Sequence, residues 1–73
     1  MTISAYNHIQ STPSTTWTVV HNLNTSIINI DVVILNGIVY EKILPANITI
    51  VDNNNITIML LLEYSGSARI VGN

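Results

Sequence analysis

Hydrophobic and polar residues alternate along most of the chain with the period of two that is typical of β-strands. The clearest example is residues 27–35, whose even positions are all β-branched and apolar: Ile28, Ile30, Val32 and Ile34. Its odd positions mix apolar and polar side chains. We therefore predict a strand with one face in the core and the other face partly exposed.

Looser alternation predicts further strands over residues 3–10, 16–21, 46–51 and 56–63. In the second of these, Trp17 and Val19 share one face. In the last, one face holds four apolar residues: Ile56, Ile58, Leu60 and Leu62.

Between the first two predicted strands lies a Ser/Thr/Pro-rich segment, residues 11–15. Pro13 has no backbone N–H to donate, and Thr12 before it is restricted to extended geometry. We predict a loop or an arm here. The chain then divides into an N-terminal strand and arm, residues 1–15, and a β-domain, residues 16–73.

The dipeptide Asn36-Gly37 is typical of a type I′ hairpin turn, which needs positive φ at both central residues. A two-residue loop at this position predicts three cross-strand pairs: Leu35 with Ile38, Val33 with Tyr40, and Asp31 with Lys42. The last pair would be an ion pair. The same register sets Glu41 opposite Val32 on the core face, which fits poorly unless a bulge or a strand end lies there.

Two more connections follow from matching apolar faces, since a slip of one residue would turn every side chain to the wrong face. A three-residue loop at 53–55 predicts Ile50 opposite Ile58 and Ile48 opposite Leu60. A turn at 65–67 predicts Leu62 opposite Ile70, Tyr64 opposite Ala68, and an ion pair of Glu63 with Arg69.

No segment has a helical period with capping residues, so the chain is predicted to be all-β. We expect a small antiparallel β-sandwich of six or seven strands, with a partial barrel as the other architecture that such short strands allow. The second faces of these strands carry surplus apolar side chains. We predict that they form an oligomer interface of Val33, Leu35, Ile38, Tyr40, Met59 and Leu61.

Composition supports oligomerisation. The chain has 73 residues, of which 48% are hydrophobic and 8% charged, whereas about 25% of residues are charged in an ordinary soluble domain. It has no Cys and therefore no disulfide, and no ligand spacing suggests structural zinc. A small core without these supports is marginal unless subunits bury further surface. We therefore expect the chain to form a homo-oligomer.

Charge and hydropathy exclude several classes of function. A net charge of −2, with two basic residues, lacks the positive surface of nucleic-acid-binding proteins. We see no signal peptide, and no apolar run reaches membrane-spanning length.

The residue types of a hydrolase are present, namely several Ser, His21, and Asp31 or Asp52. Their spacing selects no catalytic triad, and the chain has no Gly-x-Ser-x-Gly motif. We predict no enzyme and no cofactor. His8 and His21 are candidate metal ligands, the more so if one His is repeated around a three-fold axis. We favour a His that bonds a backbone carbonyl at a strand end, and predict no metal.

The aromatic residues are a candidate sugar-binding platform, because aromatic faces stack on pyranose rings: Trp17, Tyr6, Tyr40 and Tyr64. We favour the interpretation that Trp17 packs in the core, since an aromatic ring buries a large area there.

Placed in order, the motifs show a resemblance to a known group of domains: Trp17, His21-Asn22-Leu23, a hairpin, Pro45 and a strand, Asp52-Asn53-Asn54-Asn55-Ile56-Thr57-Ile58, and Ser65-Gly66-Ser67-Ala68. Over about residues 14–72 this order resembles small β-domains that recur in tailed-phage virion proteins, notably tail-fibre and appendage modules. Each motif by itself is ordinary turn or strand chemistry, so the resemblance depends on their order and spacing.

The resemblance implies a non-enzymatic β-sandwich that assembles, often as a trimer, into a fibre, a baseplate part or a capsid ornament. Its place would be the virion, assembled in the host cytoplasm, and its partners would be its own copies and other virion proteins. A separate decoration, cement or adaptor subunit is equally allowed. The alternative is a receptor-binding or carbohydrate-binding tip module that meets host surface glycan through Trp17 and the Tyr residues.

Overall fold

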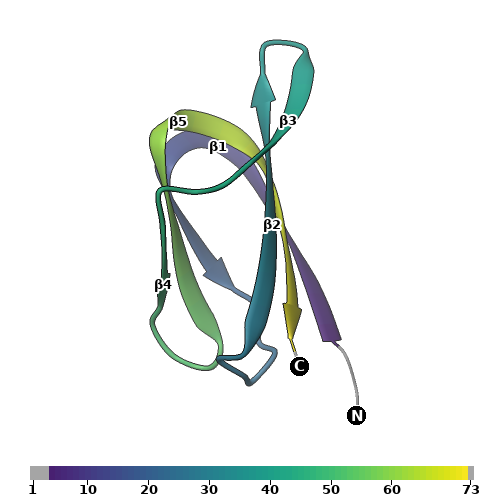
Figure 1. The fold of residues 1–73 in the computed structure, drawn as a ribbon, viewed down its shortest axis with the longest axis vertical. Coiled ribbons are helices and arrows are strands. Elements are labelled where there is room, and N and C mark those ends of the chain that lie inside the picture. Colours follow the sequence, from purple (N-terminus) through teal and green to yellow (C-terminus); the bar gives the residue numbers. More distant parts are fainter. Residues whose placement is uncertain (1–3, 73) are drawn as a thin grey trace.

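The computed structural model describes residues 4–72, which form one antiparallel sheet of five strands (Figure 1). The strands are β1 (Ser4–Val20), β2 (Ile28–Asn36), β3 (Val39–Ile43), β4 (Asn47–Ile50) and β5 (Asn55–Gly72). Their order is β1-β5-β2-β3, and β4 also pairs with β5. The all-β prediction is confirmed, but the described residues hold five strands in place of the expected six or seven.

Two long strands account for the difference in number. β1 runs through the segment predicted to be a loop at residues 11–15, and β5 runs through the predicted turn at 65–67, so both predictions are wrong. β1 and β5 pair with each other from Ser4↔Gly72 to Val20↔Asn55. The predicted domain boundary at residue 15 therefore falls inside a strand.

Pro13 is tolerated in β1 because of where the strand lies. β1 is at one edge of the sheet and pairs only with β5 among the described strands. Pro13 also falls between the paired positions Gln10 and Ser14, where the register shifts. Its missing N–H therefore leaves no ladder bond unmade.

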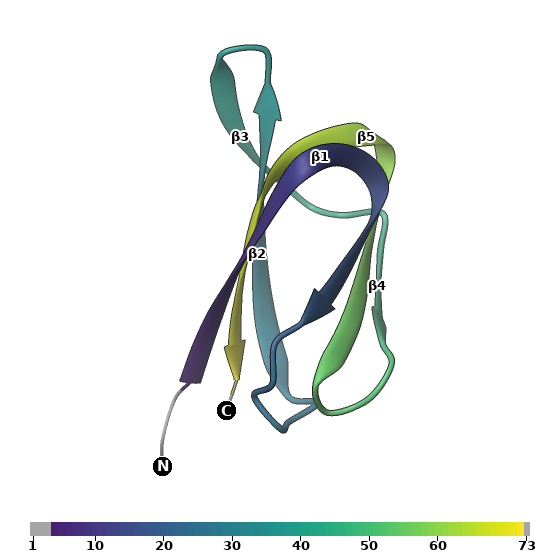
Figure 2. The ribbon, with the colours of Figure 1, turned by 180° about the vertical axis from the view of Figure 1, so that it is seen from behind.

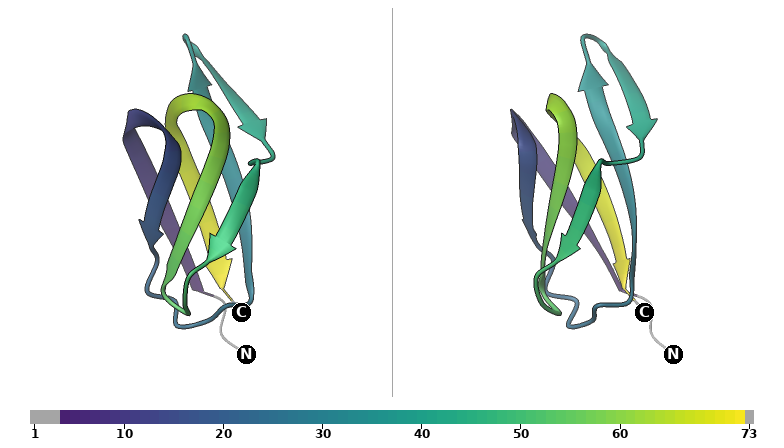
Figure 3. Two further views of the ribbon diagram at one scale, coloured as in Figure 1. Left: turned by 90° about the vertical axis from the view of Figure 1, so that its left-hand side faces the viewer. Right: turned by 60° about the vertical axis from the view of Figure 1, so that its left-hand side comes forward.

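Both long strands bend sharply at the same level, as Figures 1 and 2 show. From the pair Ser14↔Tyr64 to the pair Thr16↔Met59, β1 advances by two residues and β5 by five. The three extra residues of β5 form a bulge, which bends a strand and increases its twist. The bend folds the sheet over itself, so that the two halves of each long strand run at an angle to one another (Figure 3).

Gly66 lies just beyond this bulge, at φ +157°. A Cβ at this position would collide with the carbonyl oxygen of Val33 and would lie 2.9 Å from the Cα of Ile34. Gly66 therefore lets β5 approach β2 closely. Residues 65–67, predicted to form a turn, lie within β5.

The core fills the space inside the folded sheet and takes residues from both sides of the bend: Trp17, Val19, Val32, Ile34, Ile56, Ile58, Leu60, Ala68 and Ile70. The predicted core faces of residues 16–21 and 27–35 are thus confirmed. Leu62 is the exception to the predicted core face of residues 56–63. It follows the pattern of Leu60 in sequence, yet it lies in the bulge and is 61% exposed.

The β2–β3 hairpin has a different register from the one predicted. Its two-residue loop is Gly37-Ile38, with Asn36 paired to Val39, and positive φ occurs at Gly37 alone. This is the pattern of a type II′ turn.

The observed register sets Ile43 opposite buried Val32 and Glu41 opposite buried Ile34. Glu41 is nevertheless exposed, and its carboxylate accepts a hydrogen bond from the Asn36 amide. The predicted ion pair still forms, because Lys42 Nζ reaches Asp31 Oδ1 diagonally at 3.0 Å.

The pairing of β4 with β5 is also displaced by two positions from the prediction. Ile48 pairs with Ile58 and Ile50 with Ile56. Apolar side chains still face apolar side chains, because a shift of two preserves the alternation. Arg69, expected opposite Glu63, is paired with Asn7 on β1 and Asp31 on β2.

Candidate functional site

Trp17 is completely buried and holds the bend together. Its indole Nε1–H points at two backbone carbonyl oxygens, those of Ser14 at 3.1 Å and Tyr64 at 3.2 Å. These carbonyls lie on the two strands at the bulge, where the regular ladder is interrupted. The indole therefore provides the donor that this interruption removes, and it leaves no face of Trp17 open to a sugar.

The three Tyr residues lie on three different strands. Tyr6 on β1 and Tyr40 on β3 are exposed, whereas Tyr64 of β5 is half-buried at the bend. A platform built around Trp17 is therefore not assembled in this structure. Tyr40 is the most exposed of the three rings, at 68%.

His21 is enclosed by its own chain, with 2% of its surface exposed. Its Nδ1 accepts the N–H of Leu23 at 3.1 Å, and its Nε2 has no hydrogen-bond partner among the described residues. His8 Nε2 bonds the Gln10 side-chain oxygen at 2.8 Å. Neither ring bonds a backbone carbonyl, so that interpretation was wrong. Within residues 4–72 no three potential metal ligands gather in one group.

Two Asn-rich loops are joined at the base of the molecule. The carbonyl oxygen of Asn54 accepts the backbone N–H of His21 at 2.9 Å, and the Asn54 side chain accepts the N–H of Asn24 at 2.8 Å. Asn22 and Asn24 adopt φ of +55° and +54°, which Asn tolerates better than most residues. These loops connect β1 to β2 and β4 to β5, so their contacts close the lower end of the fold.

Asp52 organises the second of these loops. Its carboxylate accepts the backbone N–H of Asn54 at 2.8 Å and the side-chain amide of Asn55 at 2.9 Å. These hydrogen bonds, the Asn54 bond foremost, lower the pKa of Asp52 below its ordinary value. Asp31, the other carboxylate considered for catalysis, is paired with Lys42. Both carboxylates therefore have structural partners.

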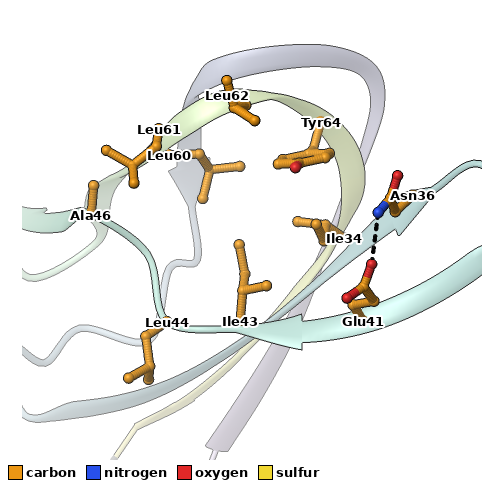
Figure 4. Close-up of a pocket in the computed structure, with 10 residues that line it drawn as sticks. All are labelled: Ile34, Asn36, Glu41, Ile43, Leu44, Ala46, Leu60, Leu61, Leu62 and Tyr64. Carbon is orange, nitrogen blue, oxygen red and sulfur yellow. Dashed lines mark hydrogen bonds between the residues drawn. The ribbon is translucent and has the colours of Figure 1, made fainter.

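A hollow of about 330 Å³ lies between the β2–β3 hairpin and the bend of β5. Figure 4 shows its lining residues: Ile34, Asn36, Glu41, Ile43, Leu44, Ala46, Leu60, Leu61, Leu62 and Tyr64. The core residues Ile34 and Leu60 form its floor. At the rim Leu44 is 95% exposed and Leu61 87% exposed.

The polar groups of the hollow are paired with each other. The side-chain amide of Asn36 donates to Glu41 Oε1 at 2.8 Å, on one side of the opening (Figure 4). Leu, Ile and Ala side chains line most of the rest, but polar atoms still make up a large part of the exposed lining. The hollow therefore presents both apolar and polar groups.

Beside the hollow, the hairpin tip, defined as residues 37–40, projects beyond the rest of the molecule (Figure 1). Ile38 at the turn is 96% exposed, and Val39 is 56% exposed. Exposed apolar side chains grouped in this way are typical of protein-binding surfaces.

Of the six residues predicted to form an interface, Leu61 lines the hollow and Ile38 and Tyr40 lie in the hairpin tip, whereas the other three belong to neither. Val33 and Leu35 are half-buried, while Ile38, Tyr40, Met59 and Leu61 are exposed. Sequence reasoning missed Leu44, which follows the last residue of β3, and Leu62. The position of Leu44 before Pro45 at a strand end was a usable signal. Leu62 had no such signal in the sequence, because its exposure depends on the bulge.

Comparison with protein-family models, with curated proteins and with solved structures finds no match to this chain. Among residues 4–72 no helix is long and apolar enough to span a membrane. The functional argument therefore rests on the geometry of the hollow, the hairpin tip and the buried polar residues.

Proposed function

We propose that the chain is a non-enzymatic structural subunit of a tailed-phage particle, which acts by assembling with copies of itself and with other virion proteins. The observation that carries the proposal is the nearly complete exposure of Ile38, Leu44 and Leu61 on a folded chain. Exposed apolar groups of this size around a hollow are typical of protein-binding surfaces.

The use of the polar residues supports a structural role over a catalytic one. His21 is buried and bonded to its own loop, Asp52 is engaged by Asn54 and Asn55, and Asp31 is bonded to Lys42. A hydrolase needs a nucleophile, a base and oxyanion donors that meet in a pocket. The hollow is lined instead by Leu and Ile side chains with one paired carboxylate.

The virion assignment comes from the resemblance to tail-fibre and appendage modules. It implies a β-sandwich trimer, a place in the assembled particle, and a role in a fibre, a baseplate or a capsid decoration. A folded-over sheet with an apolar outer surface is compatible with each of these roles. We expect mass spectrometry to detect the chain in purified phage particles. We also expect deletion of its gene to abolish intact particles. Absence from the particles would contradict the assignment.

Self-assembly is tested by sedimentation velocity at micromolar concentration. We expect the wild-type chain to sediment as an oligomer, with a trimer favoured, and Leu61→Glu to sediment as a monomer with an unchanged circular dichroism spectrum. Ile27→Glu is the matched control, because Ile27 is 69% exposed but lies at the opposite end of β2. A monomeric wild-type chain would contradict the proposal.

A glycan-binding tip module is the second candidate, supported by the exposure of Tyr40 on the projecting hairpin. It predicts binding on a glycan array that Tyr40→Ala abolishes while the fold is retained. Trp17, being buried, is left out of this candidate. Binding that survives in Tyr40→Ala would count against it.

A further inference from the structure

We infer that Asn36 is a site of spontaneous covalent modification, at which the side-chain amide is lost and a second carboxylate forms beside Glu41. Asn36 is the only Asn in the chain that is followed by Gly. Both Asn36 and Gly37 are exposed at the turn of the β2–β3 hairpin. The modification weakens this end of the hairpin, and it does so whether or not the chain assembles.

The reaction uses the two neighbouring residues and water. The backbone nitrogen of Gly37 attacks Cγ of Asn36 and closes a ring. The Cγ–Nδ2 bond breaks, and Nδ2 leaves as ammonia with the proton of the Gly37 N–H. Water then opens the ring. Cleavage of the new N–Cγ bond leaves Asp, whereas cleavage at the main-chain carbonyl leaves an isoaspartyl link that runs through the former side chain.

The turn leaves the attacking nitrogen accessible. The β2–β3 ladder ends at the pair Asn36↔Val39, so the Gly37 N–H is not part of it. Nothing lies within 4 Å of a Cβ built at Gly37, and Gly has no side chain to obstruct the approach of its nitrogen to Cγ. Attack within one chain is efficient when the two atoms can approach in this way.

Ring closure requires Asn36 to leave its extended conformation, and the hairpin tip permits this at low cost. The tip projects beyond the rest of the molecule (Figure 1). Ile38 is 96% exposed and Val39 56% exposed, so local opening uncovers little apolar surface. Segments with few buried contacts open far more often than the core does.

The product changes the electrostatics of the hairpin. Before modification, the Asn36 amide donates to Glu41 Oε1 at 2.8 Å (Figure 4). Loss of the amide adds one negative charge to the formal net charge of −2 and leaves two carboxylates that can only accept hydrogen bonds. Like charges so close together repel each other. The isoaspartyl product also lengthens the main chain beside the pair Asn36↔Val39.

Peptide mapping by mass spectrometry tests the site. The purified chain is incubated at neutral pH, and replacement of the amide NH2 by OH is measured at each Asn over time. We expect Asn36 to convert roughly tenfold faster or more than Asn47. Asn47 is the control within the chain, because it is also exposed but precedes β-branched Ile48, which hinders the attack.

The variant Asn36→Gln keeps an amide beside Glu41 but must close a larger ring. We expect it to remain unmodified at position 36 over the time in which the wild type converts. Absence of conversion at Asn36 in the wild type would overturn the site. Conversion at Asn36 and Asn47 at equal rates would overturn it as well.

The variant Asn36→Asp reproduces one product and tests the effect on the hairpin. We expect amide hydrogen exchange over β3 to accelerate by about fivefold or more relative to the wild type. Adding Glu41→Gln to the same chain should restore slow exchange, because a Gln side chain can donate to the new carboxylate. Unchanged exchange in Asn36→Asp would overturn the weakened hairpin. Faster exchange that Glu41→Gln does not reverse would overturn the role of Glu41.

Discussion

Positions 66 and 37 require glycine for different physical reasons. At Gly66 the obstacle is steric, because a Cβ would collide with the Val33 carbonyl oxygen in the neighbouring strand. At Gly37 nothing lies within 4 Å of a Cβ, and the requirement is the left-handed backbone of the hairpin turn. One residue type therefore serves strand packing in one place and turn geometry in the other.

Alanine substitutions distinguish these two roles. Gly37→Ala is expected to cost about 1–2 kcal/mol of stability, the penalty of a left-handed conformation for a residue with a Cβ. Gly66→Ala is expected to cost more, because two backbones must separate as well. Urea denaturation of both variants measures the difference. Equal losses would show that the close approach of β5 and β2 is not rigid.

The Asp52 carboxylate makes the base of the molecule sensitive to acid. Its pKa is lowered in the folded chain by hydrogen bonds from Asn54 and Asn55. A group of this kind stabilises the folded state above its unfolded pKa, of about 3.9, and loses that contribution as the pH falls through the lowered folded pKa. Stability should therefore decrease on acidification below about pH 4.

Asp52→Asn isolates this contribution, since an Asn side-chain oxygen can still accept the Asn54 N–H but does not titrate in this range. We expect the free energy of unfolding to depend less on pH in the variant than in the wild type between about pH 2 and 5. Denaturation series at several pH values measure this pH dependence. Parallel curves for the two proteins would rule out the assigned role.

At the scale of elements, the long strand β5 combines features that the sequence presents as separate strands. Its residues alternate regularly from Ile56 to Leu62, yet the bulge opposite Thr16 interrupts that pattern. Leu60 remains in the core, at 7% exposure, while Leu62 lies at the rim of the hollow. The bulge therefore turns an apolar strand face into a surface feature.

The pair Leu60→Ala and Leu62→Ala tests this description. Leu60→Ala should cost about 2–5 kcal/mol, as for a buried leucine. Leu62→Ala should change the stability of the isolated chain by about 0.5 kcal/mol or less. Chemical denaturation at low concentration, where assembly does not contribute, compares them. Similar large losses for both would mean that Leu62 is buried.

The registers of both hairpins differ from the predictions by two positions. Matching apolar faces selects between odd and even registers only, since side chains repeat every two residues along a strand. In the observed registers, Glu41 accepts a hydrogen bond from Asn36 near the β2–β3 turn, and Asp52 caps the loop between β4 and β5. These are local polar interactions that the apolar pattern does not contain.

At the scale of the whole molecule, the described chain is elongated, with extents of 39 × 20 × 18 Å. The joined Asn-rich loops close one end, and the hairpin tip projects from the other (Figure 1). Apolar side chains are exposed at both ends, among them Val20, Ile27 and Val51 beside the loops and Ile38 at the tip.

Assembly should also appear in the thermal stability. If subunits bury the hollow and the tip, the folded oligomer is favoured by mass action and the Tm rises with chain concentration. We expect this increase in the wild type and in Ile27→Glu, and its loss in Leu61→Glu. Scanning calorimetry over a hundredfold range of concentration measures it. A Tm independent of concentration in the wild type would contradict assembly.

The alternation of apolar and polar residues was sufficient to predict an all-β chain and the core faces around Trp17 and Val32. These depend on neighbours in sequence and on the period of two. The merging of strands into β1 and β5, the hairpin registers and the hollow were decided by the tertiary structure. They depend on which strands lie next to each other, for example at Gly66, where β5 passes close to Val33 of β2. The residue pattern along one strand does not contain that information.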